Sequence, residues 1–295
     1  MHVKVAFGAR LVESVCLKVL VDDSVGAKGE SRLVAKHGLS VIVQAKAKAM
    51  DVCVLVDVGP SAEALFNNVD VIGVNLRKID AIMLSHGHYD HVDGLIPLLK
   101  VVGKSVPVFA HPSAFCPKFS YRKKLRFIGA SFTTSAVRQA GGIPFLTNSA
   151  VSIAEGVVTT GEVERVTDYE KPRGFLTVDG GRLVEDALVD DQALIINLRG
   201  KGLVVLTGCA HSGIVNTIYH AQKVAGTREV YAVLGGFHLV DATNQRLSKT
   251  IEALKDFNLE FLGPCHCTGK KAIQRLAEAF GDKCHQVKTG DVIKF

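Results

Sequence analysis

The stretch AIMLSHGHYDHVDGL, residues 81–95, places three histidines and two aspartates directly behind a short apolar run. Ala81–Leu84 has the composition of a buried strand, so the histidines follow the end of that strand. Polar and ionisable groups are costly to gather beside buried chain unless a ligand compensates for the lost water. The stretch therefore predicts a metal site at the end of a sheet.

The spacing of these side chains is H-x-H-x-D-H. Because a loop after a strand can turn alternate residues toward one point, we expect His86 and His88 to bind one ion. Asp90 and His91 are expected to face a second ion nearby. Imidazole nitrogen and carboxylate oxygen suit zinc, iron or manganese, and two close ions can hold a hydroxide and an anionic substrate. A histidine-rich surface loop is the alternative interpretation.

Three later strand ends each carry a histidine close to glycine: VVLTGCAHSG (204–213), AVLGGFHL (232–239) and LGPCHCTG (262–269). Glycine allows a backbone to turn sharply or approach a ligand closely. We expect His211 and His266 to be further metal ligands. For His238 the alternatives of ligand, substrate contact and support for a ligand stay open.

Two other side chains stand near the predicted site. Asp57 ends the apolar run VCVLVD, where a carboxylate can accept an imidazole N–H and orient a ligand. Cys209 is either a metal ligand or a neighbour of one. Asp90 and His238 are the candidate catalytic residues.

The remaining pattern predicts an α/β chain. Short runs rich in Val, Ile and Leu alternate with amphipathic segments, and Arg199–Gly202 is the turn of a hairpin. This mixture predicts packed sheets covered by helices. The expected strands are Val15–Val21, Leu39–Val43, Val52–Val58, Ala81–Leu84, Val106–Ala110, Ala193–Leu198, Leu203–Thr207 and Val230–Leu234. The expected helices are Ser61–Asn68, Asp93–Val102, Gly213–Val224, Asn244–Phe257 and Gly269–Phe280.

We expect one domain over residues 1–295, with a candidate cap or loop insertion over 115–161. That stretch contains KFSYRKKLRF, whose Arg122, Lys123, Lys124 and Arg126 are candidates for binding substrate phosphates. A solvated basic face is the alternative for these four residues.

Composition excludes several classes of protein. Hydrophobic residues make up 47% and charged residues 22%, which argues against disorder. No apolar run approaches the roughly 18 residues of a membrane span, the N-terminal residues lack a signal-peptide pattern, and seven cysteines form no even disulfide framework. We therefore expect a soluble cytoplasmic protein. The net charge of +6 weakly favours an anionic ligand, and the basic track is too short for a nuclease.

Taken together, these motifs resemble the metallo-β-lactamase superfamily, through SHGHYDH (85–91) and the earlier strand-end Asp57. The resemblance implies a four-layer αββα sandwich with a two-metal site at one edge of the sheets. A narrower resemblance is to the branch of dihydropterin–ribofuranosylaminobenzene 5′-phosphate synthases. The stretches that carry it are KHGLS (36–40), VDVGPS (56–61), LSHGHYDHVDGL (84–95), TGCAHSGIVN (207–216), GGFHL (235–239) and PCHCTG (264–269).

The narrower resemblance implies a metal-dependent transferase of methanopterin biosynthesis. Its reaction joins a pterin methyl diphosphate to a ribofuranosylaminobenzene phosphate and releases diphosphate. The implied cofactors are two divalent ions, zinc first, with manganese, iron or magnesium as alternatives, and the implied substrate is small, anionic and aromatic. Two positions depart from the pattern: Cys209 stands near the place of a bridging aspartate, and Lys36 replaces an expected acid.

Two rival functions share the same ligands. The first is a binuclear-metal hydrolase of phosphodiesters, lactones or thioesters, because one fold hosts many chemistries. The second is a diiron redox or metal-sensing protein. A substrate panel with and without an acceptor separates transferase from hydrolase, and a redox titration tests the second rival.

Overall fold

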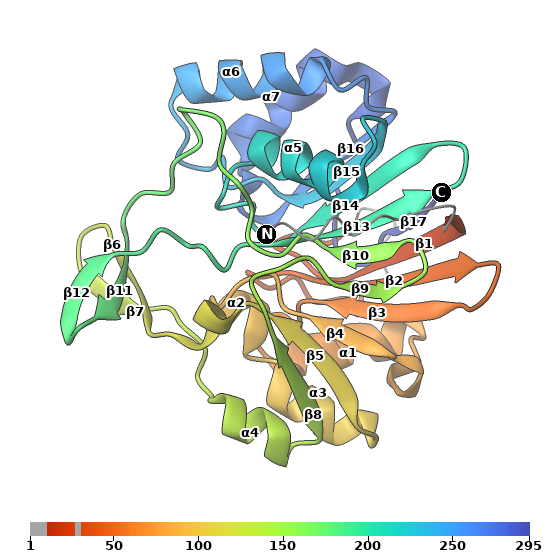
Figure 1. Cartoon of the computed structure of the whole chain (residues 1–295), viewed down its shortest axis with the longest axis vertical. Helices are drawn as coiled ribbons and strands as arrows, with labels where there is room; N and C mark the ends of the chain where they lie inside the picture. The colour runs from red at the N-terminus through yellow and green to blue at the C-terminus, as the bar shows by residue number, and fades with distance from the viewer. Residues whose placement is uncertain (1–10, 27–30) are drawn as a thin grey trace.

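The scaffold of the protein is a large sheet that folds back on itself (Figure 1). The computed structural model describes residues 11–26 and 31–295. Thirteen strands of this described chain belong to the sheet, ten of them on one continuous path. In spatial order the path runs β16 (Phe261–Cys265), β15 (Val230–Gly236), β14 (Gly202–Thr207), β13 (Ala193–Leu198), β1 (Val12–Val21), β2 (Ser40–Ala47), β3 (Val52–Val56), β4 (Ala81–Met83), β5 (Val106–Ala110) and β8 (Gly142–Leu146).

Three short strands lie off this path: β10 (Val157–Thr159) pairs with β13 and β9 (Ser152–Ala154), while β17 (Val292–Lys294) pairs with β1. The connection between β1 and β13 is slight, since Val12 and Leu198 are their one registered pair. The two halves of the path therefore turn toward each other.

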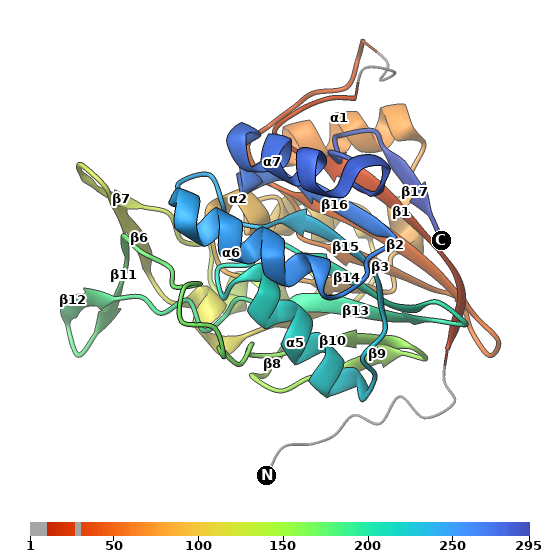
Figure 2. The same cartoon turned by 90° about the horizontal axis from the view of Figure 1, so that it is seen from above.

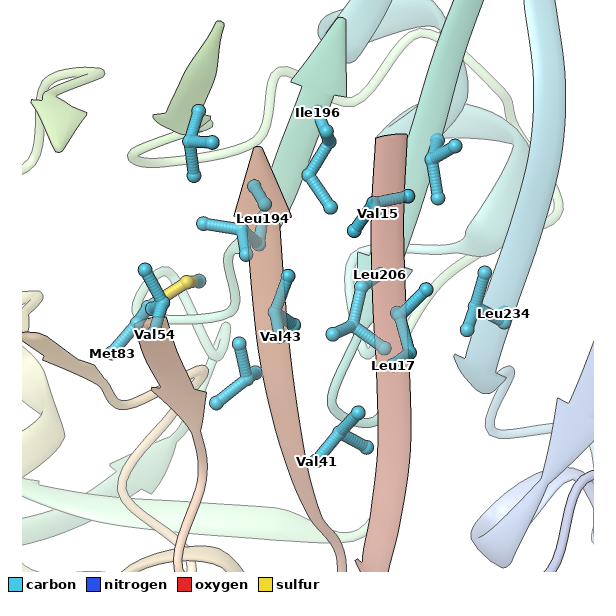
Figure 3. Close-up of a cluster of buried hydrophobic side chains, with 14 of the residues drawn as sticks. Val15, Leu17, Val41, Val43, Val54, Met83, Leu194, Ile196, Leu206 and Leu234 are labelled. Carbon is cyan, nitrogen blue, oxygen red and sulfur yellow. The ribbon is translucent and has the colours of Figure 1, made fainter. Parts of the chain in front are cut away.

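Their facing sides bury an apolar cluster (Figure 3). Val41, Val43 and Val54 come from one half, and Leu194 and Leu206 come from the other. Alternate residues of β2 point into this cluster, as the two-residue period of a strand requires. Burial of these side chains between the sheets is a main source of stability at about 25 cal/mol per Å² of apolar surface.

Helices cover the outer sides of both halves (Figures 1 and 2). The apolar faces of α1 (Ala62–Ile72) and α3 (Leu95–Val102) pack with α4 (Thr134–Gln139) over the first half. On the second half lie α5 (Ile214–Ala225), α6 (Asn244–Lys255) and α7 (Lys270–Phe280). Helix, sheet, sheet and helix make four layers, which confirms the predicted αββα sandwich.

A second, four-stranded sheet stands away from the body (Figure 1). We call it the arm; its order is β12 (Arg182–Glu185), β11 (Phe175–Asp179), β6 (Lys118–Tyr121) and β7 (Leu125–Phe127). The expected insertion at 115–161 thus contributes to two places. Its first part supplies β6 and β7 of the arm, and its later part supplies β8, β9 and β10 of the main sheet.

The eight predicted strands and five predicted helices all form, with ends shifted by a few residues. The hairpin between β13 and β14 also forms at the predicted turn. The strand β16 was not predicted, because it contains Gly263 and Pro264 and both residue types are uncommon inside strands. Proline is tolerated there since β16 lies at the edge of the sheet, where a missing N–H breaks no ladder.

The topology brings several strand ends to one place. β3, β4 and β5 run parallel to one another, as do β14, β15 and β16. The carboxyl ends of parallel strands meet at one edge of a sheet, so the loops after them are neighbours. Short elements continue from two of these ends: α2 (Tyr89–Val92) and the 3₁₀ turn His266–Thr268. Within the described ranges, no helix is long and apolar enough to cross a membrane.

Candidate metal centre

Three histidine nitrogens meet at what we call the first position. His86 and His88 follow β4, and His211 follows β14. His86 Nε2 lies 2.9 Å from His88 Nδ1, and His211 Nε2 lies 3.2 Å from the same atom. A tetrahedral ion with bonds of about 2.0–2.1 Å needs ligand nitrogens about 3.3 Å apart. The three buried rings therefore have the spacing of a zinc-type N₃ site.

A second position lies beside the first. His91 Nε2 is 3.2 Å from His266 Nε2 and 3.1 Å from Cys209 Sγ. Asp90 Oδ2 lies 3.4 Å from His266 Nε2 and 3.7 Å from His91 Nε2. The structure thus brings together all six residues that the sequence nominated as metal ligands, and it places Cys209 beside them as a seventh donor.

Asp57 holds two of these ligands from behind. Its carboxylate accepts hydrogen bonds from His91 Nδ1 at 2.6 Å and from the Ser85 amide and hydroxyl, both at 2.7 Å. The Ser85 hydroxyl donates to Asp57 and lies 2.9 Å from His86 Nδ1, so it is left to accept the hydrogen bond from the N–H of that ring. Both imidazoles therefore carry hydrogen on Nδ1 and present the lone pair of Nε2 to the centre. Asp57 orients His91 directly and His86 through Ser85, and it does not itself face the centre. The sequence analysis predicted this supporting role for Asp57 but missed Ser85.

His266 is oriented by a pair of aspartates that the sequence analysis also missed. Asp23 Oδ1 accepts from His266 Nδ1 at 2.6 Å, and Asp22 Oδ1 accepts from the His266 amide at 2.8 Å. Asp23 Oδ2 also binds His37 Nδ1 at 2.9 Å, and His37 Nε2 lies 3.4 Å from Asp90 Oδ2. The dipeptide Asp22–Asp23 at the end of β1 was the available signal, since an acid at a strand end had already singled out Asp57.

The backbone around the centre is strained. Six non-glycine residues of the described chain have a positive φ, and four of them lie here: Asp57, Ala210, His238 and His266, at 56°, 50°, 44° and 47°. Such conformations cost free energy and persist only where the surrounding contacts enforce them. Their concentration marks these loops as built for ligand placement.

The loop between His86 and His88 is clamped from both sides. A Cβ at Gly87 would stand 1.9 Å from the Ala114 carbonyl oxygen, so only glycine fits there. The Gly87 amide donates to Asp190 Oδ2 at 2.8 Å. Asp190 Oδ1 in turn accepts from the ammonium of Lys118 at 2.8 Å, and this lysine is 1% exposed. The arm strand β6 is thereby tied to the metal loop.

A cavity of about 560 Å³ opens from the centre toward the arm. Arg122 and Arg126 of the arm line it, together with Lys270 from α7. Lys123 and Lys124 do not line it, so the structure separates the four nominated basic residues into two pairs. Arg122 also pairs with Asp241 at 2.5 Å, which ties the tip of the arm to the loop after β15.

His238 lines the same cavity beside the first position, with its ring centroid 4.2 Å from that of His211. Its Nδ1 is buried and has no hydrogen-bond partner among the described residues. Together with Cys209 and Cys267 it forms a group whose donor atoms lie within 4.8 Å of one another. His238 thus lies next to both the cavity and the donor atoms of the first position.

Burial keeps the ligands of the first position neutral. It lowers the pKa of His88 to about 3 and places those of His86 and His211 well below the ordinary value, with the neighbouring imidazoles adding to the effect. Burial alone would raise the pKa of Asp90, but the charge of His91 and the hydrogen bond from His266 outweigh it, so this pKa is lowered. The neutral imidazoles of the first position and the ionised Asp90 suit a divalent cation. At the second position burial alone would lower the pKa of His266, but Cys267, Asp23 and Asp90 outweigh it and raise that pKa, so this ring must lose a proton before it can bind metal.

Comparison with known proteins agrees with this geometry. The family model of the metallo-beta-lactamase superfamily matches residues 36–187. The chain belongs to the metallo-beta-lactamase superfamily. Members of this superfamily bind divalent metal, and the convergent histidine, cysteine and aspartate donors of this chain fit that property.

Two curated relatives are similar to this chain over most of its length. A 7,8-dihydropterin-6-methyl-4-(beta-D-ribofuranosyl)-aminobenzene-5'-phosphate synthase of Methanocaldococcus jannaschii is 33% identical over 290 residues, covering 96% of this chain and 98% of that protein. An uncharacterised protein of the same organism is 31% identical over 89% of this chain and 94% of its own length.

Solved structures give the same result. The crystal structure of Tm1679, a metal-dependent hydrolase of the beta-lactamase superfamily, matches with a TM-score of 0.78 at 25% identity, over 95% of this chain and 98% of that one. A diphosphatase from the PhnP family shares the fold at 13% identity with a TM-score of 0.50, over 97% and 98% of the two chains. These matches identify the protein as an enzyme of this superfamily.

Proposed function

We propose that the protein binds two divalent ions, with zinc as the first choice and manganese, iron or magnesium as alternatives. His86, His88 and His211 would hold one ion, and Asp90, His91 and His266 the other. Imidazole-rich sets of this kind suit zinc or iron better than magnesium, which prefers oxygen ligands. The convergence of these ring nitrogens, spaced 2.9–3.2 Å apart, supports this proposal.

We propose that the reaction is that of a dihydropterin-ribofuranosylaminobenzene phosphate synthase. A pterin methyl diphosphate would be joined through its methylene carbon to a ribofuranosylaminobenzene phosphate, with release of diphosphate. The observation that carries this proposal is the 33% identity to the Methanocaldococcus synthase over nearly the full length of both chains. Bound divalent ions would supply positive charge that stabilises the departing diphosphate.

The cavity has the groups that such a substrate needs. Arg122, Arg126 and Lys270 place positive charge around its wall, where they can bind phosphate oxygens. Phe175 and Ile128 give the same wall an apolar part, against which an aromatic ring can pack. The lining therefore offers positive charge for the phosphates and an apolar surface for the rings of an anionic aromatic ligand.

We assign different roles to the two candidate catalytic residues. Asp90 Oδ2 faces the rings of His91, His266 and His37, so its carboxylate acts chiefly as a ligand. His238 lines the substrate cavity and remains the candidate to accept the proton that the acceptor's amine loses when its new carbon bond forms.

We also propose a small-molecule substrate and a cytoplasmic location. The basic residues at the cavity form a local group, which is too small for a nucleic-acid track. All seven cysteines lie in the described ranges and are free thiols, as is usual in a reducing compartment.

The test is a substrate panel with metal-loaded protein. A dihydropterin methyl diphosphate would be offered with and without 4-(β-D-ribofuranosyl)aminobenzene 5′-phosphate, and products would be followed by mass spectrometry. The proposal expects the joined product and diphosphate only when both substrates are present, and their loss in His86→Ala. If the joined product does not form with any of the four ions (zinc, manganese, iron or magnesium), the proposal is contradicted.

A hydrolase is the second candidate, because the hydrolase structure with a TM-score of 0.78 shares 25% identity with this chain. The same cavity would then accept a phosphodiester, lactone or thioester, with water as the acceptor. Turnover of such a compound without the aminobenzene partner, together with no joined product, would favour this candidate over the synthase.

A further inference from the structure

Cys209 lies between the two metal positions. Its Sγ is 3.1 Å from His91 Nε2 of the second position. It forms one close donor group with His91 and His266, and another with His86 and His211 of the first position, with all donor atoms of each group within 4.8 Å. This thiol is thus a close neighbour of histidines from both ligand sets.

The local backbone places the thiol there. Cys209 follows β14, and a Cβ at the preceding Gly208 would stand 2.0 Å from Ser85 Oγ, so the turn must pass close to the metal loop. Ala210 then adopts a left-handed φ of 50°, which allows Cys209 and His211 to face the same centre. The thiol is 3% exposed, so the protein interior surrounds it.

We propose that the thiolate of Cys209 is a ligand shared by both ions, which makes the centre sulfur-bridged. This inference rests on the proposed binuclear centre and adds a soft donor to its nitrogen and oxygen ligands. On binding, the S–H bond breaks, the proton leaves to the buffer, and sulfur bonds to both ions. A thiolate bridge favours zinc or iron(II) over manganese and magnesium, which prefer oxygen donors.

A neighbouring thiol provides the matched control. Cys267 Sγ donates to the Cys209 carbonyl oxygen at 3.7 Å and belongs to a group with Cys209 and His238, but to neither group with the histidines of the two positions. Cys267→Ser therefore removes a buried sulfur next to the centre without removing the proposed bridge. Cys53 lies in β3 against the α1 layer and serves as a remote buried thiol.

The direct test is X-ray absorption at the zinc edge of the wild-type holoprotein, which requires no variant. A shared thiolate predicts an average of one sulfur per zinc, at about 2.3 Å. Half a sulfur per zinc would make Cys209 a terminal ligand of one ion and overturn the bridge. Two zinc ions with only nitrogen and oxygen neighbours would overturn any ligand role.

Variants then assign the sulfur. In the cobalt(II)-loaded protein, we expect a thiolate charge-transfer band in the near ultraviolet that falls at least fivefold in Cys209→Ser and in Cys209→Asp. Cys267→Ser and Cys53→Ala should keep it. Cys209→Asp, which retains a bridging-capable carboxylate, should lower the preference for zinc over manganese at least tenfold. A band that persists in Cys209→Asp and disappears in Cys267→Ser would assign the sulfur to Cys267 and overturn the proposal.

These readouts separate this inference from the proposed reaction. A sulfur-bridged pair of zinc ions in a protein that makes no joined product would support the bridge and contradict the synthase. Synthase activity with two ions and no sulfur neighbour would support the reaction and contradict the bridge. Failure to bind any divalent ion would contradict both.

Discussion

The two walls of the cavity are built differently. The inner wall consists of strand-end loops whose donor side chains are buried, with several held from behind by a partner such as Asp57 or Asp23. The outer wall is the arm, where Tyr121 and Phe127 remain 58% and 54% exposed. The ends of the main sheet thus position the donor groups proposed to bind metal, while an exposed sheet forms the other side of the proposed substrate cavity. Under the proposed function, this difference places reaction chemistry and substrate choice on separate elements.

Lys118 connects these two walls. It lies at the start of β6 and reaches Asp186 and Asp190 at 3.0 and 2.8 Å, while Asp190 holds the Gly87 amide of the metal loop. Burial alone would lower the pKa of this lysine, but the two carboxylates outweigh it and raise the pKa. The lysine is therefore charged, and the arm is anchored by a buried ionic group.

The largest expected effect comes from breaking this anchor. Lys118→Met leaves the carboxylates of Asp186 and Asp190 without their cation, which should lower the free energy of unfolding by about 3–5 kcal/mol. Denaturant unfolding of the apoprotein measures it. Adding Asp186→Asn and Asp190→Asn to Lys118→Met should restore part of the lost free energy of unfolding. A loss below about 1 kcal/mol in Lys118→Met alone would show that this buried ionic group contributes little to stability.

The next effect tests the support of the inner wall. Asp57→Asn removes the carboxylate that accepts from His91 Nδ1 and Ser85, so the rings lose their fixed orientation. We expect zinc affinity to fall about 10- to 100-fold, measured by competition with a chelator. Asp80→Asn is the control, because this exposed aspartate lies just before β4, at the opposite end of the strand from the histidines. Unchanged affinity in Asp57→Asn would mean that the ligands need no such support.

A smaller effect is expected on the outer wall. Arg126→Gln removes one positive charge from the lining while leaving the metal ligands intact. We expect KM for the phosphate-bearing substrate to rise about three- to tenfold with kcat little changed, and the effect to shrink at high salt. A fall in kcat with constant KM would instead place this arginine in the chemical step.

The smallest effect on KM is expected for Lys123 and Lys124, the two lysines between Arg122 and Arg126 in the arm. Lys123 and Lys124 do not line the cavity, so replacing both by Gln should change KM less than about twofold. Parallel kinetics with Arg126→Gln give the comparison within one charged segment. An equal rise in KM for both variants would indicate a diffuse electrostatic field and no defined contact.

The sequence predicted the metal loop because its signal is local: an apolar strand followed by histidines at fixed spacing. The approach of His211 and His266 to the same centre was also predictable, since each follows its own strand beside glycine. Asp23 was missed, although its place just after β1 was a local signal of the same kind as Asp57; its partner His266, 243 positions away, could not be named from any local pattern. Tertiary contacts alone create that pair.

The arm shows the same limit. Its strands come from residues 118–127 and 175–185, which pair only in three dimensions. The sequence contained the basic residues of KFSYRKKLRF, yet their division into Arg122 and Arg126 at the cavity and Lys123 and Lys124 away from it depends on how the β6–β7 hairpin is placed. Strand twist and packing decide that, and neither is visible in a residue pattern.

The central claim is that the inner wall holds two divalent ions. It is tested most directly by elemental analysis of purified protein, comparing wild type with the double variant His86→Ala, Asp90→Ala, which removes one ligand from each position. The account predicts about two metal ions per wild-type chain and their loss in the double variant, with the fold retained by circular dichroism. A wild-type protein that takes up no divalent ion under any loading condition would contradict it.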